Sequence, residues 1–172
     1  LTSWLFLIVA IAIKIEDGGS VFYRQDRCTK DGKIFSILKF RSMIEHIEDG
    51  KIYITKHKDN RITKVGYIIR KTKIDELPQL VNILKGDMSL VGPRPERPEL
   101  IADILKEIPE YNFRTTVKAG LTGYAQVHGD YHTDFLEKLR WDMIYIENYS
   151  IILDLKILIM TIPTILRGSS DV

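Results

Sequence analysis

The stretch between residues 75 and 98 places the tightest limits on how this 172-residue chain can fold. It contains Pro78, which a helix tolerates only in its first turn, and Gly86, a residue type that commonly ends helices. The pattern therefore predicts a short helix that begins within residues 72–77 and ends at Lys85–Gly86.

Two adjacent acids, Asp75 and Glu76, would lie in the first turn of this helix. Thr72 precedes Asp75 by three residues, which is the spacing of a capping box. The helix dipole and the free N–H groups of a first turn favour ionised carboxylates and also attract phosphate. Acids are common at helix starts, so the pair alone indicates either a functional site or ordinary helix-favouring residues. Four apolar residues at helical spacing are predicted to face the core: Leu77, Leu80, Val81 and Leu84.

A further acid and a constrained arginine follow the predicted helix. Asp87 comes first, and Arg94 then lies between Pro93 and Pro95, whose fixed φ angles hold the loop rigid and aim the guanidinium in advance. Nucleophilic or metal-binding carboxylates beside a preset arginine suit chemistry on a phosphate ester. A structural alternative is an ion pair of Arg94 with Asp87 or Glu96.

The composition is that of one ordinary folded domain, with 45% apolar and 28% charged residues. The net charge of +2 is small, but basic residues crowd the approach to Asp75. As a group they suit an anionic substrate or a phospholipid surface, although each could be a solvated surface charge. The absence of interleaved aromatic residues and of a recognition motif argues against nucleic acid as a partner. These basic residues are Lys56, Lys58, Arg61, Lys64, Arg70, Lys71 and Lys73.

Cysteine and histidine usage gives no metal cluster. Cys28 is the only cysteine, so a disulfide within the chain is impossible and a reducing, cytoplasm-facing location fits. The histidines are scattered and are interpreted as surface or structural residues: His46, His57, His128 and His132.

The chain opens with ten consecutive apolar residues, from Trp4 to Ile13. They would form about 15 Å of helix, whereas a bilayer core needs about 20 residues, so this segment cannot span a membrane alone. A basic start and a cleavage site are missing, which argues against a signal peptide. The segment could be a buried core helix, an interfacial helix, or the second half of a re-entrant hairpin.

Residues 150–166 form the other strongly apolar segment. Asp154, Lys156 and Pro163 interrupt it, which favours an amphipathic helix lying in a membrane interface over a span. A plain buried core helix is the alternative.

The remaining segments predict the fold class. Residues 21–27 and 33–40 alternate between apolar and polar around Asp31-Gly32, which indicates a β-hairpin. Residues 98–108 and 135–148 are predicted helices, and Glu45–Lys51 is a polar helix-to-loop stretch. The sequence therefore predicts an α+β fold: a helix-rich single domain with a small β-hairpin.

Several blocks of the sequence, in a fixed order, closely resemble those of the bacterial sugar transferases, which are monotopic phosphoglycosyl transferases. The resemblance runs from Val21 to about Leu166. The blocks are residues 75–98, Phe22-Tyr23-Arg24-Gln25-Asp26-Arg27, Lys39-Phe40-Arg41-Ser42-Met43, Gly120-Leu121-Thr122-Gly123-Tyr124-Ala125-Gln126-Val127 and Tyr145-Ile146-Glu147-Asn148-Tyr149-Ser150.

The resemblance implies a specific reaction. In the family, the residue matching Asp75 is a nucleophile that takes a sugar 1-phosphate from a nucleotide diphosphate sugar, usually a UDP-sugar, and releases the nucleoside monophosphate. Undecaprenyl phosphate then accepts the phosphosugar, which starts a capsule, exopolysaccharide or lipopolysaccharide O-antigen. A carboxylate is an acceptable phosphoryl acceptor, and its mixed anhydride is reactive enough to pass the group on.

The resemblance also implies a cofactor and binding residues. Mg²⁺ would neutralise the charge of the diphosphate and would bind one or two protein carboxylates. Glu76 is the expected ligand. Alternatively, Glu76 could orient or deprotonate the lipid phosphate. The expected substrate-binding residues are Lys39, Arg41, Arg70, Asp87, Pro93, Arg94 and Pro95, of which the first three could be simple surface charges and Asp87 could support Arg94.

The family placement implies a monotopic enzyme of the bacterial inner membrane whose active site faces the cytoplasm. We expect residues 1–15 to be the later part of a re-entrant membrane helix whose first half is missing, and residues 16–172 to be the catalytic domain. A homodimer is left open. Three positions depart from the family pattern: Ala119, Asp130 and Gly19. The acidic Asp130 would weaken binding of an anionic donor or change the choice of sugar.

Two other functions fit the same residues. In a metal-dependent phosphohydrolase, water would replace the lipid acceptor. In an interfacial scaffold of a polysaccharide assembly complex, the site would be inert. Incubation with the sugar donor alone separates the three, because only the transferase traps the phosphosugar on the protein.

Overall fold

The computed structural model describes residues 3–44, 59–129 and 133–167 of the chain. Several predicted features lie outside these residues: the stretch Glu45–Lys51, the basic residues Lys56 and Lys58, Asp130, and three of the four histidines.

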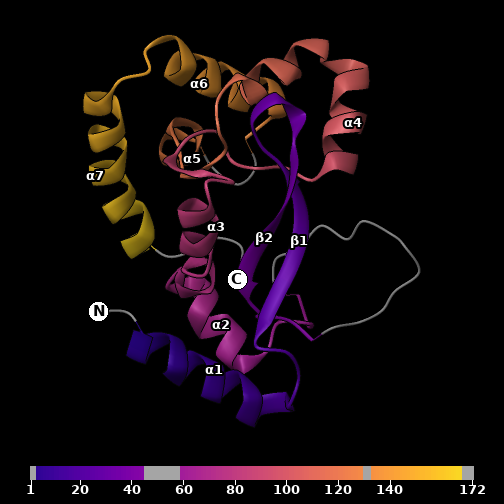
Figure 1. The fold of residues 1–172 in the computed structure, drawn as a ribbon, viewed down its shortest axis with the longest axis vertical. Coiled ribbons are helices and arrows are strands. Elements are labelled where there is room, and N and C mark those ends of the chain that lie inside the picture. The colour runs from indigo at the N-terminus through magenta and orange to yellow at the C-terminus, as the bar shows by residue number, and fades with distance from the viewer. Residues whose placement is uncertain (1–2, 45–58, 130–132, 168–172) are drawn as a thin grey trace. The chain divides into compact units, whose positions relative to one another are not determined.

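The described chain is rich in helix and contains two small sheets, as the predicted α+β class requires (Figure 1). The α-helices are α1 Ser3–Asp17, α2 Lys64–Lys71, α3 Gln79–Lys85, α4 Pro98–Glu107, α5 Tyr124–His128, α6 Phe135–Glu147 and α7 Ile151–Arg167. The strands are β1 Phe22–Cys28, β2 Ile34–Phe40, β3 Ser89–Val91 and β4 Gly120–Thr122. Short 3₁₀ segments are η1 Lys30–Gly32, η2 Ile74–Glu76 and η3 Pro109–Thr116.

The residues divide into two compact units, each with its own hydrophobic clusters. The first unit comprises Leu1–Tyr23, Leu38–Pro78 and Ile165–Val172. The second comprises Arg24–Ile37 and Gln79–Thr164. The β1–β2 hairpin contributes residues to both.

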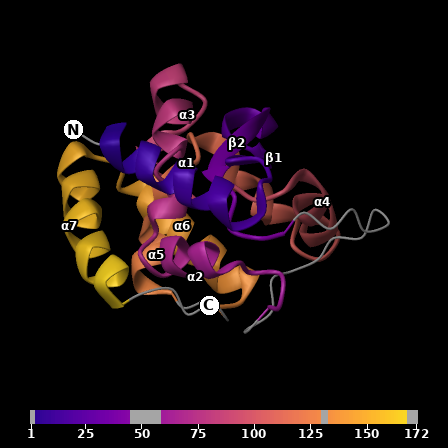
Figure 2. The same cartoon turned by 90° about the horizontal axis from the view of Figure 1, so that it is seen from below.

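In the first unit, α1 packs against α2 (Figure 2). Their contact is built from Val9, Ile13 and Ile69, with Phe40 from the end of β2. Most other apolar side chains of α1 are exposed: Trp4, Leu7, Ile8, Ile11 and Ile15. Helix α1 is therefore not a fully buried core helix, because only one of its faces lies in the core.

The predicted hairpin is confirmed as strands β1 and β2, which form one two-stranded sheet. Asp31 and Gly32 have φ angles of 57° and 71°. These left-handed values are the ones for which an Asp-Gly sequence is suited. The turn is closed by the N–H of Thr29, which donates to the carbonyl of Lys33.

The helix predicted around Pro78 is right at its end and wrong at its start. It ends at Lys85, and Gly86 follows with a φ of 82°. However, α3 begins only at Gln79, directly after Pro78. The predicted capping box at Thr72 is also wrong, because this residue ends α2 and its hydroxyl donates to the carbonyl of Ile68.

The prediction that the apolar residues of this helix face the core is partly wrong. Val81 and Leu84 are 38% and 87% exposed, whereas Gln79 and Asn82 are almost fully buried. The amide of Asn82 donates to the carbonyl of Ser36 over 2.9 Å. A buried polar side chain with a partner thus takes the place that the periodic pattern assigns to leucine.

The second unit contains a parallel strand pair that the sequence pattern does not predict. Strand β3 pairs with β4 in the register Ser89↔Gly120 and Val91↔Thr122. The two backbones approach closely, since a Cβ on Gly120 would lie 2.1 Å from the amide nitrogen of Gly92. Glycine is therefore required at this contact.

Helices α4, α6 and α7 confirm the three predicted helices to within two residues at each end. Ile157 of α7 is fully buried, whereas six other large apolar side chains described for this helix are exposed: Ile151, Ile152, Leu155, Ile159, Ile162 and Ile165. None of the described helices has both the length and the apolar character needed to cross a membrane.

Candidate active site

Asp75 lies in the single turn η2, between the end of α2 and the start of α3. Lys73 enters the turn in the left-handed conformation, with a φ of 57°. The N–H groups of Glu76 and Leu77 donate to the carbonyls of Lys73 and Ile74, which closes the turn. Asp75 is therefore held by a short, hydrogen-bonded segment and not by a loop.

The Asp75 carboxyl is almost removed from solvent, with an exposed fraction of 7%. In the described part of the chain, its Oδ1 atom has no hydrogen-bond partner. Burial raises the pKa of Asp75 to about 6; Lys39, Arg70 and Lys73 oppose the rise, while Glu76 adds to it. An unsatisfied buried carboxylate is costly and points to a functional role.

Glu76 points to a lysine from the hairpin. Lys39 Nζ lies 2.7 Å from Glu76 Oε1, and both side chains are more than 80% buried, at 18% and 15% exposure. The structure thus brings together four of the predicted site residues: Lys39, Arg70, Asp75 and Glu76.

Arg41, another predicted substrate ligand, is 5% exposed and its guanidinium is held by protein groups. It donates to both carboxylate oxygens of Asp17 and, through Nε, to the carbonyl of Ser20. A Cβ on Gly19 would lie 2.8 Å from Arg41 Cζ, so glycine at this position lets the guanidinium fit.

The predicted rigid turn at Pro93–Pro95 belongs to the second unit, as does Asp87. Four successive carbonyls, from Pro93 to Glu96, each accept a hydrogen bond. The donors are Gly120 N, Arg114 Nη2, Arg27 Nη1 and Cys28 N, at 2.9 to 3.0 Å. These bonds fix the turn more firmly than the prolines alone would.

The turn buries Pro93 and Pro95 and exposes the side chain of Arg94. Arg94 lines a small hollow of the second unit together with Thr29, Glu96 and Arg114. Asp87 is held at the end of α3, where its Oδ2 accepts a hydrogen bond of 3.3 Å from Asn82.

Arg114, which no sequence pattern singled out as a site residue, is buried and donates to the carbonyl of Arg94 in this turn. Its Nε and Nη2 lie 3.0 and 2.8 Å from Asp142 Oδ2, and Nη1 donates to the hydroxyl of Tyr111. Burial alone would lower the pKa of Arg114, but Asp142, Tyr111 and Glu96 outweigh it and raise the pKa.

A signal for this ion pair was present in the sequence. Asp142 shares the buried face of α6 with Leu139 and Tyr145, at a spacing of three residues. An acid on the apolar face of a helix requires a buried cationic partner.

The acidic groups fit a Mg²⁺ site in which the protein supplies only part of the coordination. Among the described residues, no cluster of three or more acidic, histidine or cysteine side chains is present. Asp75 and Glu76 supply two adjacent carboxylates, and Asp75 Oδ1 lacks a partner within the part of the chain that the structure describes. Since Mg²⁺ usually takes one or two carboxylates and completes its coordination with substrate phosphates and water, this donor set is sufficient.

The bacterial sugar transferase family model matches residues 1–168 of the chain. The chain is 44% identical over 98% of its length to UDP-N-acetylgalactosamine-undecaprenyl-phosphate N-acetylgalactosaminephosphotransferase of Aeromonas hydrophila. It is 42% identical over 94% of its length to the UDP-glucose:undecaprenyl-phosphate glucose-1-phosphate transferases of Klebsiella pneumoniae and Caulobacter vibrioides.

The chain spans 40%, 36% and 62% of the lengths of these three relatives, in that order. The match nevertheless covers nearly all of this chain, including both units and every predicted site residue. This chain belongs to the bacterial sugar transferase family.

Proposed function

We propose that this chain transfers a sugar 1-phosphate from a UDP-sugar to undecaprenyl phosphate, through a covalent intermediate on Asp75. The product would start a membrane-linked glycan such as a capsule, an exopolysaccharide or an O-antigen. The names of the relatives support the two substrates. The observation that carries the proposal is the buried Asp75 carboxyl, which has one oxygen without a partner among the described residues and which feels the positive charge of nearby basic residues.

In the first step, a carboxylate oxygen of Asp75 bonds to the phosphorus that carries the sugar. The bond between that phosphorus and the bridging oxygen of the diphosphate breaks, and uridine monophosphate leaves with the electron pair. Lys39, Arg70 and Lys73 place positive charge around Asp75, which reduces the repulsion between the carboxylate and an anionic donor.

In the second step, a phosphate oxygen of undecaprenyl phosphate attacks the same phosphorus. The bond from phosphorus to Asp75 breaks, which restores the carboxylate and leaves a sugar diphosphate on the lipid. The mixed anhydride makes Asp75 a good leaving group in this step.

Glu76 is proposed to hold Mg²⁺, which when bound would supply charge neutralisation at the diphosphate. Lys39 lies 2.7 Å from the same carboxylate and keeps it oriented. Arg94, exposed on its rigid turn, is proposed to bind the phosphate or the uridine end of the donor.

The same proposal places the protein at the cytoplasmic face of the bacterial inner membrane. Helices α1 and α7 each expose a row of large apolar side chains, which suits an interfacial position. Undecaprenyl phosphate leaves the bilayer at a cost of about 0.8 kcal/mol per CH₂, so the active site must reach the lipid phosphate at the surface.

Intact mass spectrometry with donor alone tests the proposal. The protein is incubated with UDP-glucose or UDP-N-acetylgalactosamine and no lipid. A mass increase of one sugar phosphate, with an equal amount of uridine monophosphate, is expected for at least one donor. Catalytic release of free sugar phosphate would instead indicate a phosphohydrolase. The absence of a reaction with any UDP-sugar would indicate a non-catalytic scaffold.

The rate of adduct formation should depend on pH through Asp75. Because the nucleophile must be ionised and burial raises the pKa of Asp75 to about 6, kcat/KM is expected to rise about tenfold per pH unit below 6 and to level off above 7. Circular dichroism at each pH serves as the control for folding. A flat profile between pH 5 and 8 would contradict this assignment.

Changing Arg94 to lysine should impair use of the donor strongly, although the change conserves the charge. Lysine keeps the charge but loses the planar, two-pronged donor, so kcat/KM for the UDP-sugar should fall at least about tenfold, or 1.4 kcal/mol. The KM for undecaprenyl phosphate should stay within twofold. Lys106→Arg on α4, in an exposed pair with Asp103, is the matched control. Parent-like donor kinetics in Arg94→Lys would show that the arginine is structural.

A further inference from the structure

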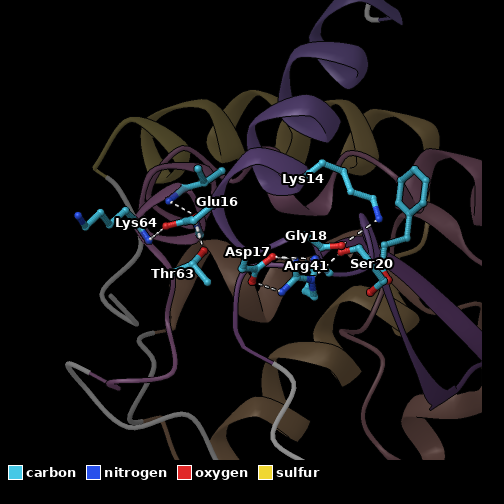
Figure 3. A network of polar contacts seen from close by, with 12 residues as sticks. Lys14, Glu16, Asp17, Gly18, Ser20, Arg41, Thr63 and Lys64 are labelled. Atoms are coloured by element: carbon cyan, nitrogen blue, oxygen red, sulfur yellow. Dashed lines mark hydrogen bonds and ion pairs between the residues drawn. The ribbon is translucent and has the colours of Figure 1, made fainter.

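The last turn of α1 carries two acids, and each contacts an element that leads to the Asp75 site (Figure 3). Glu16 contacts the start of α2, and Asp17 contacts the residue that follows β2. All of these residues belong to the first unit. The end of α1 is therefore tied to two separate supports of the same site.

Glu16 caps helix α2. Its Oε1 accepts from the N–H of Lys64 over 2.7 Å, and its Oε2 accepts from the N–H of Val65 over 3.0 Å. Thr63 accepts from the next N–H, that of Gly66. Capping of this kind is normally provided by a residue next to the helix, whereas here one carboxylate comes from a different helix.

A continuous series of hydrogen bonds runs from α2 to η2. The N–H of Thr72 donates to Ile68, that of Lys73 donates to Arg70, and that of Glu76 donates to Lys73. Hydrogen bonds thus link the end of α2 to the turn that carries Asp75.

Asp17 holds the second support of the site, the end of strand β2. It is paired with the buried guanidinium of Arg41, and its Oδ1 also accepts from the N–H of Gly19. The hydrogen bond from Arg41 is the main cause that lowers the pKa of Asp17 to about 2, and the hydrogen bond from Gly19 is the second. The ion pair therefore stays ionised at neutral pH. The N–H of Arg41 donates to the carbonyl of Val21, which joins the ends of the two hairpin strands.

Arg41 lies two residues after Lys39, the residue that pairs with Glu76. Phe40, between them, packs on Val9 and Ile13 of α1. The end of β2 is therefore held to α1 by an apolar contact and by the ion pair with Asp17, and this anchors the backbone that presents Lys39.

We propose that Glu16 and Asp17 are positioning residues, which fix α2 and β2 to the end of α1 and thereby align Asp75, Glu76 and Lys39 for phosphosugar transfer. The inference rests on the proposed function in naming the reaction. It adds that the position of α1 is transmitted to the reacting carboxylate by these two acids.

Hydrogen exchange tests the structural part without any activity. In Glu16→Gln and Asp17→Asn, the N–H groups of Glu76 and Leu77, which close η2, should exchange at least tenfold faster than in the parent protein. The N–H of Ile101 in α4 should not change. Glu16→Gln is the milder variant because its amide oxygen can still accept one of the two hydrogen bonds. Unchanged exchange at η2 would overturn the proposal.

Single-turnover adduct formation with a UDP-sugar tests the functional part. The rate constant should fall at least tenfold in each variant, with the donor KM within twofold and the final amount of adduct unchanged. A merely structural role would lower the final amount, because fewer molecules would be folded, and would leave the rate constant within twofold; this second result would overturn the proposal.

Lys14→Gln is the matched control. Lys14 lies in the same network, but among the described residues its Nζ donates only to the carbonyl of Gly18, which follows α1. It should behave as the parent in both measurements; an equal effect would show that the two acids have no special role and would overturn the proposal. A parent protein that forms no adduct would defeat the proposed function, and hydrogen exchange at η2 would then decide the positioning role alone.

Discussion

Changing Asp75 to asparagine is expected to abolish phosphosugar transfer, with a loss of at least about a thousandfold in the rate of adduct formation, or about 4 kcal/mol of barrier. The amide has nearly the shape of the carboxylate but cannot serve as a phosphoryl acceptor. The neighbouring Glu76 is paired with Lys39 and is assigned a different role. Retention of activity within about tenfold would remove Asp75 from the nucleophile role.

The same variant should be more stable than the parent at neutral pH. Burial raises the folded-state pKa of Asp75 from 3.8 to about 6. Between these values the folded protein holds a proton that the unfolded chain has lost, so the stability of the parent falls as pH rises from about 4 to about 6. The asparagine variant does not lose this stability, so above pH 6 its free energy of unfolding should exceed that of the parent by at most about 3 kcal/mol.

Two measurements check these opposite effects together. Intact mass spectrometry with donor follows the adduct, and denaturant unfolding at pH 4 and pH 7 follows stability. The stability gain of Asp75→Asn should be small at pH 4 and larger at pH 7. Asp103→Asn, which removes an exposed acid on α4, should change neither measurement. A variant that is inactive and also less stable at pH 7 would indicate a structural acid.

Local sequence signals predicted the elements that depend on nearby residues. The hairpin follows from Asp31-Gly32, whose left-handed φ angles suit the turn. Helices α4, α6 and α7 follow from their apolar periodicity and their lengths. Asp75 and Arg94 are predicted site residues mainly because the blocks around them resemble those of the family, since acids alone are common at helix starts.

Features that depend on distant residues could not be predicted in this way. Strands β3 and β4 are three residues long, and their pairing joins Ser89 to Gly120 across a helix and a 3₁₀ segment. Asn82 is buried because a carbonyl from the hairpin accepts its amide hydrogen, and this displaces leucine from the inner face of α3. The role of Arg41 likewise depends on Asp17, which lies 24 residues earlier.

Removing the buried guanidinium of Arg114 is expected to give the largest loss of stability in the second unit. Arg114→Met leaves Asp142 buried at 1% exposure without its cationic partner. Asp142 already has one oxygen, Oδ1, without a partner among the described residues. Breaking a buried pair from one side costs about 3–5 kcal/mol.

A double variant separates the cost of the orphaned charge from the value of the pair. Arg114→Met with Asp142→Leu should be more stable than Arg114→Met alone, because no buried charge remains uncompensated. Unfolding can be followed by the fluorescence of Trp141 in a Trp4→Phe background, since Trp141 lies in α6 beside Asp142. A single variant as stable as the parent would show that the pair is dispensable.

The effect should also reach the turn that presents Arg94, the residue proposed to bind the donor, because Arg114 Nη2 donates to the carbonyl of Arg94 over 3.0 Å. In the double variant no unpaired charge remains buried, but the hydrogen bond to the carbonyl of Arg94 is still missing. The turn that presents Arg94 would then lose one of its four carbonyl anchors, and the KM for the UDP-sugar should rise even where stability is regained. Recovery of stability without recovery of donor binding would therefore show that Arg114 serves the turn as well as the core.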